Sequence, residues 1–517
     1  MPIDRRRFLR SGAVGVAGVA VAGATTGCAP ASFTMNESAT RFAHGVASGD
    51  PLADRVILWT RITPTRDERG AAVPTRWWIG EHADGRAPVA EGVAVAEPAR
   101  DYTVKVDAEG LVPGVSYHYG FEAGGERSTT GRTRTLPPTG VARVRLAFLS
   151  CSNYPAGFFN GYGHLARRDD LDAVLHLGDY LYEYGHAEYG DGTALGRIPA
   201  PLGETITLDD YRWRHASYKA DPDLQAAHGR HPWITVWDDH ETANNSHTTG
   251  AQNHDPETEG RWRDRMLAAI RAYYEWMPIR ELPTGLFRRF RFGDLLDLVM
   301  LDTRLQRDAQ VARRDDAGAN DPDRSLLGED QTGWLLDALS QSAQDGIRWR
   351  VIGQQVVVSP SAVSPAGFNP DAWSGYRESR RQVLGHLLDE GIRDVVFLSG
   401  DVHSSWVFEV PHDDGTPRCA LEFVCPAISS PPIGRSRSID EETRARIAQV
   451  EHLAWFDIDH NGYAVVELTP EAARVEYLRS APVEARSPEA REVAVFEAAA
   501  GTHRVVRVDP ADGDARG

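Results

Sequence analysis

Between residues 143 and 400 the chain alternates short, fully apolar runs with longer segments of helical periodicity, and this alternation limits the possible folds most strongly. Strands buried on both faces read as uninterrupted apolar runs, whereas half-exposed strands alternate apolar and polar residues. The pattern therefore predicts an α/β domain in which helices cover sheets. The predicted strands are Val144–Leu149, Ala173–Leu177, Ile234–Trp237, Leu298–Leu301, Val351–Ile352 and Val395–Leu398. The predicted helices are Asn160–Arg168, Leu208–Ala220, Arg261–Trp276, Gln331–Ser340 and Glu378–Glu390.

Residues 40–137 have a different pattern, with short alternating runs separated by turn residues such as Asp84-Gly85 and Gly124-Gly125. This spacing predicts an antiparallel β-sandwich. The segment Leu111–Tyr119 resembles the tyrosine corner of Ig-like and fibronectin-III-like domains, and Pro137–Gly140 is typical of a linker. The predicted strands of this region are Val56–Trp59, Thr75–Ile79, Tyr102–Val106 and Tyr117–Glu122.

We therefore predict two domains, a sandwich over residues 40–137 and a larger domain over 141–480. The larger domain ends with two strands, Tyr463–Leu468 and Ala473–Tyr477. Residues 481–517 are predicted to form a surface extension.

Residues 1–31 have the features of an export signal. Arg5-Arg6-Arg7-Phe8-Leu9 is followed by an apolar run from Gly12 to Gly27 that is too short and too weakly apolar to span a bilayer. The paired arginines resemble a twin-arginine signal, with Asp4 where Ser or Thr is usual. We expect export by the twin-arginine machinery to the periplasm, the cell surface or the medium, without a transmembrane span. Cleavage after Ala31 is favoured, and a loose lipobox before Cys28 leaves a lipid anchor open.

The charge balance excludes one class of partner. The chain has 74 acidic and 56 basic residues, for a net charge of −18, and removing the leader changes this to −21. Nucleic-acid binding needs a dense cationic surface, so no specific nucleic-acid binding is expected. The acidity has two interpretations: it provides general solubility, or it gathers carboxylates around metal ions. We expect a monomer.

Chemically active side chains follow five of the predicted strands directly. Loops after the carboxyl ends of strands converge on the ligand site in α/β sheets. So many charges would destabilise an apolar core unless something positive compensated them, and metal ions are the simplest compensation. The segments are Ser150–Asn153, Gly178–Tyr182, Asp238–Glu241 with Asn244-Asn245 behind it, Asp302–Arg304 and Gly400–His403.

The kinds of side chain in these segments indicate two unlike metals. Carboxylate and amide oxygens suit hard cations, whereas thiolate, phenolate and imidazole suit iron or zinc. Each segment alone has an ordinary structural interpretation, for example a turn at Gly178–Tyr182 or a small core residue at Cys151. The cysteines outside these segments are a separate case: Cys419 and Cys425 would lie about 20 Å apart in one extended strand, too far for a disulfide with each other. The joint occurrence of the five segments favours a dinuclear centre that can clamp a phosphoryl group.

The same segments resemble the metal-binding blocks of the calcineurin-like metallophosphoesterases, and most closely the PhoD-type alkaline phosphatase/phosphodiesterase family. The resemblance covers nearly the whole chain after the leader. It includes His44–Pro51 and Leu58–Arg61 near the N-terminus and Asp371–Arg377 near the last predicted strand. It implies an N-terminal Ig/fibronectin-III-like sandwich followed by a four-layer αββα catalytic domain.

The resemblance also implies a site with Fe³⁺ and one or two Ca²⁺ ions, with Zn²⁺ or another divalent metal not excluded. Iron would be held by Cys151, Asp179, Tyr182 and His403. Asp179 would bridge to calcium, whose further ligands would be Asp239, Asp401 and Asn245. The adjacent residues Asp238 and Asn244 remain alternatives to Asp239 and Asn245, and the role of His452 is open.

The implied activity is hydrolysis of small phosphate mono- or diesters by in-line attack of a metal-bound hydroxide or oxide. Asp179 would take part as bridging ligand, and His240 would face the leaving group or support the ligands. Arg304 and Arg377 are candidates for binding phosphate, and a structural role for each is an equal alternative. Three other hypotheses remain: phospholipase D-like use of the same site, a covalent mechanism through Cys151, and an exported calcium- or phosphate-binding protein without activity.

Overall fold

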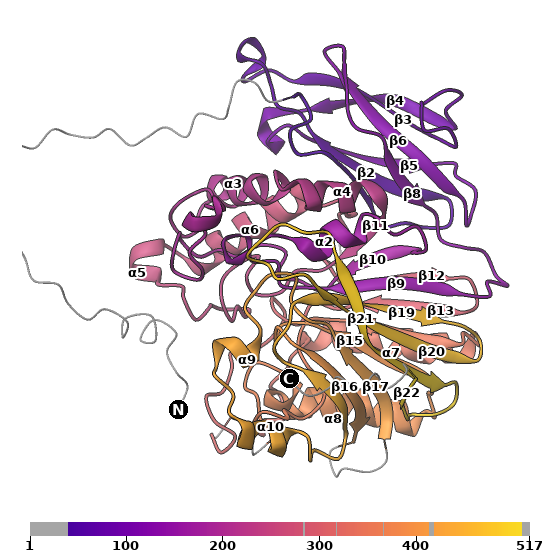
Figure 1. Cartoon of the computed structure of the whole chain (residues 1–517), viewed down its shortest axis with the longest axis vertical. Coiled ribbons are helices and arrows are strands. Elements are labelled where there is room, and N and C mark those ends of the chain that lie inside the picture. The colour runs from indigo at the N-terminus through magenta and orange to yellow at the C-terminus, as the bar shows by residue number, and fades with distance from the viewer. Residues whose placement is uncertain (1–39, 283–284, 317, 365–366, 413–417, 509–517) are drawn as a thin grey trace, which may run out of the picture.

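The computed structural model describes residues 40–282, 285–316, 318–364, 367–412 and 418–508 (Figure 1). The predicted export signal and Cys28 lie outside these residues. In the part of the chain that is described, no helix has the length and apolar character needed to cross a membrane.

Two large sheets form the centre of the molecule. Ten strands run in the order β22-β21-β20-β19-β9-β10-β11-β1-β2-β5, and seven run in the order β12-β13-β14-β15-β17-β16-β18. The first sheet contains β1 Val46–Gly49, β2 Arg55–Arg61, β5 Thr103–Glu109, β9 Val144–Leu149, β10 Ala173–His176, β11 Pro232–Thr235, β19 Gly462–Leu468, β20 Ala472–Ser480, β21 Ala490–Ala499 and β22 Val506–Arg507. The second contains β12 Arg288–Phe292, β13 Leu296–Met300, β14 Trp349–Gly353, β15 Val395–Ser399, β16 Ser405–Pro411, β17 Arg418–Val424 and β18 Leu453–Asp457.

The six apolar runs form the parallel centres of these sheets, as predicted. β9, β10 and β11 are parallel neighbours in one sheet, and β13, β14 and β15 are parallel neighbours in the other. The boundaries differ by one or two residues, as at β11, which spans Pro232–Thr235 whereas the predicted run was Ile234–Trp237.

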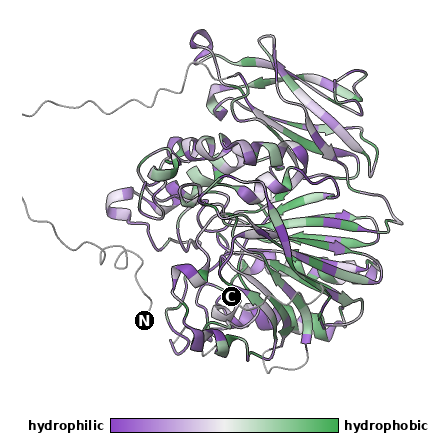
Figure 2. Cartoon of the chain, viewed as in Figure 1, coloured by the Kyte–Doolittle hydropathy of each residue, from purple (hydrophilic) through white to green (hydrophobic). Residues whose placement is uncertain are grey.

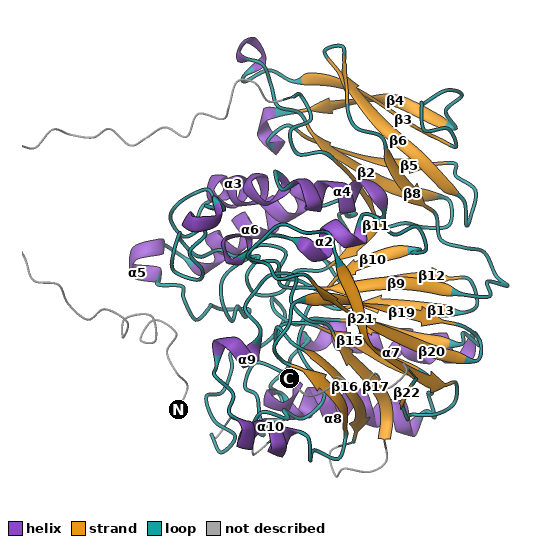
Figure 3. Cartoon of the chain, viewed as in Figure 1, coloured by secondary structure: helices purple, strands orange, loops and turns teal. Residues whose placement is uncertain are grey.

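Helices cover the outer faces of both sheets, which confirms the layered α/β fold (Figure 3). The helices on the side of the ten-stranded sheet are α2 Asn160–Leu165, α3 Leu208–Lys219, α4 Pro222–Arg230, α5 Pro256–Glu259 and α6 Trp262–Trp276. On the other side lie α7 Gly328–Gln344 and α8 Arg377–Asp389, with the short helices α9 Ile433–Ser436 and α10 Glu441–Ile447 nearby. All five predicted helices are present within a few residues of their expected ends.

The main core lies between the two sheets. Leu146 and Val174 from one sheet belong to the same buried cluster as Leu298, Val351 and Val396 from the other. The strands are therefore predominantly hydrophobic in Figure 2, whereas the helices mix polar and apolar residues. Burial of apolar area on this scale is the main contribution to stability, at about 25 cal/mol per Å².

The N-terminal region forms the predicted sandwich. A small sheet, made of β3 Val73–Gly80, β4 Ala90–Ala96, β6 Ser116–Ala123, β7 Glu126–Arg127 and β8 Gly131–Arg134, faces β1, β2 and β5. The tyrosine corner is present, since the backbone N–H of Val112 donates to the Tyr117 hydroxyl at 2.9 Å.

Two features differ from what the sequence suggested. β1 pairs in parallel with β11, so one sheet of the sandwich is continuous with the rest of the ten-stranded sheet. Gly49 makes this approach possible, because a Cβ there would lie 2.5 Å from the Trp233 carbonyl oxygen. At the other end, the expected surface extension after residue 480 is instead partly a sheet element, because β21 pairs along the whole of β20.

Candidate metal centre

The predicted ligands come from the carboxyl ends of four strands in the two sheets. Cys151 follows β9, Asp179 follows β10, Asp239 follows β11, and Asp401 and His403 follow β15. The sheets also meet directly here, since Ser150 forms a parallel bridge with Ala427. The loops gather between the helices α3–α6 and the short helix α9 (Figure 3).

These side chains converge into three overlapping groups. Within each group, the ligand atoms lie within 4.8 Å of one another. The groups are Cys151–Asp179–His403, Asp179–Asp239–His240 and Asp238–Asp239–Asp401. Asp179 belongs to the first two and Asp239 to the last two, so the arrangement offers adjacent cation positions joined by shared carboxylates. Thiol, imidazole and carboxylate donors together suit a softer metal beside a harder one. The residues present therefore fit a mixed pair of metals.

Five of the expected ligands have left-handed backbone conformations. The φ angles are 61° at Cys151, 54° at Asp179, 55° at Asn245, 64° at Asp401 and 55° at His403. Non-glycine residues adopt this conformation rarely, at a cost of about 1–3 kcal/mol each, and such residues concentrate at functional sites. The fold therefore holds these side chains in place at the expense of local backbone energy.

Gly178 brings two of the loops together. Its φ is 105°, and a Cβ at this position would lie 2.4 Å from Cβ of Asp238. Only glycine permits this approach, because a real Cβ does not come so near another carbon. The backbone of the β10 loop can therefore lie directly against that of the β11 loop, which places Asp179 beside Asp239.

Tyr182 joins the first group through its hydroxyl. The hydroxyl donates to Asp179 Oδ2 at 2.8 Å and lies 3.1 Å from His403 Nε2. The Ser430 hydroxyl donates to the Tyr182 hydroxyl oxygen at 2.7 Å. The phenol oxygen therefore lies among the side chains expected to hold iron, as the resemblance implied.

Without a cation, burial and neighbouring charge favour the protonated forms of the Cys151 thiol and the Tyr182 phenol. Burial, reinforced by the charge of Asp179, raises the pKa of the Cys151 thiol and of the Tyr182 phenol well above their usual values. A bound cation reverses this effect and favours thiolate and phenolate. These two groups therefore become strong ligands only when a positive ion is present.

Asp239 is better placed than Asp238 for binding a cation. Each carboxylate keeps one buried oxygen that accepts no hydrogen bond from the described residues, but Arg304 Nε contacts Asp238 Oδ1 directly. Asp239 also belongs to two of the three groups, whereas Asp238 belongs to one. Burial opposes ionisation of Asp239, but the charges of Arg304 and His240 lower its pKa below the usual value. Burial raises the pKa of Asp238 well above the usual value despite Arg304.

Asn245 is closer to the cluster than Asn244. Its backbone N–H donates to Asp239 Oδ2 at 2.6 Å. The backbone N–H of Asn244 donates instead to Glu183 Oε1 at 2.8 Å, and the side-chain amides of both asparagines donate to Gln252. The backbone contact with Asp239 favours Asn245 as a ligand, while its coordination of calcium stays a prediction.

Arg304 is the residue of the chain whose positive charge compensates the carboxylates of the cluster. Its side chain is fully buried and forms ion pairs with Asp371 at 2.6 Å, Asp401 at 2.9 Å and Asp239 at 3.6 Å, in addition to Asp238. A buried acidic cluster without a compensating charge would strongly destabilise the fold. These contacts account for Arg304 structurally, and its binding of phosphate stays a prediction.

His240 lies over the cluster with one ring nitrogen already engaged. Nδ1 lies 2.7 Å from Glu183 Oε2, and the ring packs against Tyr182 with centroids 4.3 Å apart. Burial opposes protonation, but the carboxylates of Asp239, Glu183 and Asp179 raise the pKa of His240 well above its usual value. These carboxylates favour the protonated imidazole, and Nε2 is its remaining polar atom.

Two buried carboxylates that sequence reasoning did not assign position these loops. Glu241 accepts hydrogen bonds from the backbone N–H groups of Asp179, Tyr180 and Asp238 at 3.1, 2.6 and 2.8 Å. Burial and the Asp179 charge raise the pKa of Glu241 to about 8. The other carboxylate is Glu183, which holds His240. Both were visible in the sequence beside Tyr182 and His240, but nothing there indicated that they accept backbone hydrogen bonds.

Two other candidates lie away from the three groups. Arg377 donates to Asn320 at 3.0 Å, and among the described residues it forms no ion pair with the cluster. His452 lies 3.3 Å from the Pro360 carbonyl oxygen and packs on Phe408. The structure therefore gives neither residue a contact with the expected ligands, and the phosphate-binding role of Arg377 stays a prediction.

Comparison with known proteins finds family matches in two regions of the chain. Residues 146–477 match the model of the PhoD-like phosphatase family, and residues 27–137 match that of the PhoD-like phosphatase N-terminal domain. Alkaline phosphatase D of Bacillus subtilis (strain 168) is 37% identical over 505 residues, which cover 92% of this chain and 84% of that protein. A solved structure described as the structure of PhoD superposes with a TM-score of 0.84 at 34% identity, covering 93% of this chain and 95% of the other.

Proposed function

The chain belongs to the PhoD-like phosphatase family and is a hydrolase of phosphoric esters; from this premise we propose that its activity depends on metals held by the three groups around Asp179 and Asp239. Ferric iron at Cys151, Asp179, Tyr182 and His403, with calcium at Asp239, Asp401 and Asn245, is the assignment that fits the donor atoms. The overlap of the groups at Asp179 is the observation that carries the proposal, because adjacent cations need a shared ligand.

When bound, the cations supply positive charge for the phosphoryl oxygens and lower the pKa of water. The chain's own residues orient the substrate and transfer protons. His240 holds a proton at Nδ1 through Glu183, so Nε2 can donate a proton to the departing alcohol oxygen. Arg304 opposes the effect of burial, which raises the pKa of Asp238 and of Asp401, and its ion pairs orient both carboxylates.

The structure does not favour a covalent mechanism through Cys151. The thiol is fully buried, donates to Ser150 Oγ at 3.1 Å and has a raised pKa. A nucleophilic cysteine needs an exposed thiol whose pKa is lowered by nearby positive charge. Cys151 therefore fits the role of a ligand better than that of a nucleophile.

Small phosphate mono- and diesters are the proposed substrates, and phospholipase D-like cleavage of a phospholipid diester is the second candidate. We also propose export by the twin-arginine route. Replacing Arg5 and Arg6 together with Lys should retain the precursor in the cytoplasm, and normal export of that variant would contradict this part of the proposal.

A pair of cysteine variants tests the metal site. Cys151→Ala should lower the iron content per chain and reduce monoester hydrolysis by at least about 10-fold. Cys425→Ala is the matched control, because its buried thiol also contacts Ser150 Oγ, at 3.4 Å, but belongs to none of the three groups. Normal iron content and activity in a folded Cys151→Ala protein would contradict the assignment. Assays of a monoester, a diester and a phospholipid in parallel then decide the substrate class.

A further inference from the structure

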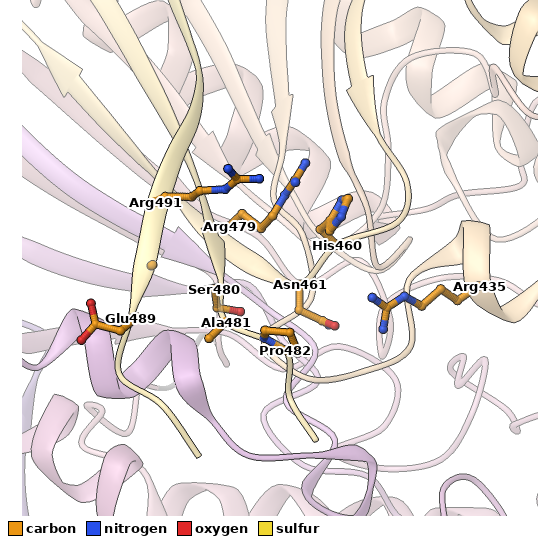
Figure 4. Close-up of a pocket in the computed structure, with 10 residues that line it drawn as sticks. Arg435, His460, Asn461, Arg479, Ser480, Ala481, Pro482, Glu489 and Arg491 are labelled. Atoms are coloured by element: carbon orange, nitrogen blue, oxygen red, sulfur yellow. The ribbon is translucent and has the colours of Figure 1, made fainter. Parts of the chain in front are cut away.

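A second site with the chemistry for binding anions lies outside the metal cluster. A pocket of about 540 Å³ opens beside β20 and β21 (Figure 4). None of its lining residues belongs to the three ligand groups, and the basic residues among them outnumber the single carboxylate. The lining consists of Arg435, His460, Asn461, Arg479, Ser480, Ala481, Pro482, Glu489, Ala490 and Arg491.

Two of the arginines lie directly opposite each other on neighbouring strands. Arg479 of β20 and Arg491 of β21 are paired in the antiparallel register, and their side chains extend along the same side of the pocket in Figure 4. Like charges in directly opposed positions destabilise a sheet unless a counter-charge lies between them. The register therefore concentrates positive charge without compensation from the strands themselves.

The surrounding acids neutralise only part of this charge. Arg479 donates to Asp457 at 2.9 Å, but its buried Nε has no hydrogen-bond partner among the described residues. Asp457 is shared with His460 Nδ1, at 2.9 Å. Arg491 has no ion pair with any described side chain.

The opposite wall of the pocket carries a third guanidinium. Arg435 of α9 lies across from Arg479 and Arg491, and its only ion pair in the described part of the chain is with the exposed Glu484, at 3.6 Å. Glu489, the one carboxylate in the lining, points away from the arginines and pairs with Arg167 at 3.4 Å. Three planar guanidinium groups around one opening match an oxyanion, which can accept several N–H donors at once.

We propose that this pocket binds a phosphate-class oxyanion, either free orthophosphate or the phosphate group of a diester, at a site distinct from the metal cluster. The loop between them places the two sites near each other, because Asn461 in the pocket donates to the Ser430 carbonyl at 2.8 Å and the Ser430 hydroxyl donates to Tyr182. The pocket nevertheless stands without the proposed metals, since its donors are arginines.

Equilibrium dialysis with labelled orthophosphate and with dimethyl phosphate tests the proposal. Arg491→Gln removes an exposed side chain that has no ion pair among the described residues, so the fold should be kept. We expect this variant to bind orthophosphate at the pocket at least about 10-fold more weakly, because charge-assisted hydrogen bonds are lost. Its kcat/KM for a monoester should stay within about twofold of the unchanged enzyme. Arg86→Gln, in an exposed turn elsewhere, is the matched control and should change neither quantity.

The two probes distinguish the sources of the anion. If only orthophosphate binding falls in Arg491→Gln, the pocket takes the free dianion; if dimethyl phosphate binding falls as well, it accepts a diester. If Arg491→Gln and the double variant Arg435→Gln/Arg491→Gln both bind the two probes with the stoichiometry and affinity of the unchanged protein, the proposal is overturned. These outcomes do not depend on whether the metal assignment is correct.

Discussion

The hydroxyl of Tyr182 donates a 2.8 Å hydrogen bond to Oδ2 of Asp179, three residues earlier in the chain. One loop after β10 therefore supplies both a phenol and a carboxylate to the same small volume. Ser430 and His403 reach the same phenol oxygen from the other sheet. The centre is thus assembled across the junction of the two sheets, and it depends on the geometry of a few loop residues.

Tyr182→Phe should weaken iron binding and lower activity by at least about 10-fold, because the phenol oxygen is lost while the ring can still pack against His240. Tyr180→Phe is the control, since its hydroxyl contacts His228 at 2.9 Å and not the ligands. The measurement is metal content together with initial rates. Equal iron content in the two variants would remove Tyr182 from the ligand set.

Gly178→Ala should destabilise the protein and reduce activity together. A Cβ would collide with Asp238, and the φ of 105° is strained for any other residue, at a cost of about 1–3 kcal/mol before the collision is counted. Gly196→Ala is a matched control, because its φ is also positive, at 66°, but no atom lies within 4 Å of the new Cβ. Thermal unfolding should show the larger decrease in Tm for Gly178→Ala, and equal decreases would contradict the packing argument.

Arg304→Met should lower Tm strongly in protein without added cations, because four carboxylates lose their shared positive partner. Removing one member of a buried ion cluster costs about 3–5 kcal/mol. If the carboxylates bind calcium, adding Ca²⁺ should restore more Tm to Arg304→Met than to the unchanged protein. Arg377→Met is the comparison, since Arg377 bonds only to Asn320 among the described residues, and it should change Tm little. If Ca²⁺ raised the Tm of Arg304→Met and of the unchanged protein equally, this would argue against a cation site at these carboxylates.

Lys219 provides a pH-dependent test of the buried interior. Burial lowers the pKa of Lys219 from 10.5 to about 7, and its ammonium lies 4.5 Å from the Trp59 ring centroid. Above pH 7 the folded chain releases a proton that the unfolded chain keeps until about pH 10.5. This residue's contribution to stability therefore rises with pH across that window, by at most about 1.4 kcal/mol per pH unit, and is constant below it.

Lys219→Met should lack this contribution. The difference in Tm between Lys219→Met and the unchanged protein should be largest near pH 7 and should shrink as the pH rises toward 10. A difference that does not vary with pH would show that Lys219 is not held neutral in the fold.

The sequence was sufficient to locate the six parallel strands and most of the candidate ligands that the structure brings together, because most of these residues directly follow an apolar run. It could not reveal that Arg304 serves the carboxylates, since that depends on contacts between loops of different sheets. The choice of Asp239 over Asp238 also depends on which oxygen Arg304 contacts. β4 was missed because its small residues, such as Ala90 and Gly92, have weak strand character. The pairing of β1 with β11 joins residues 184 positions apart, such as Ser48 and Pro232, which no local pattern predicts.

Metal analysis of the purified chain, paired with ester hydrolysis before and after chelation, tests whether the activity depends on bound metals. Iron and calcium should be bound in the untreated protein. Activity should be lost when they are removed and should recover when both are added back. A protein that holds neither metal and hydrolyses phosphate esters equally well before and after chelation would contradict this metal dependence.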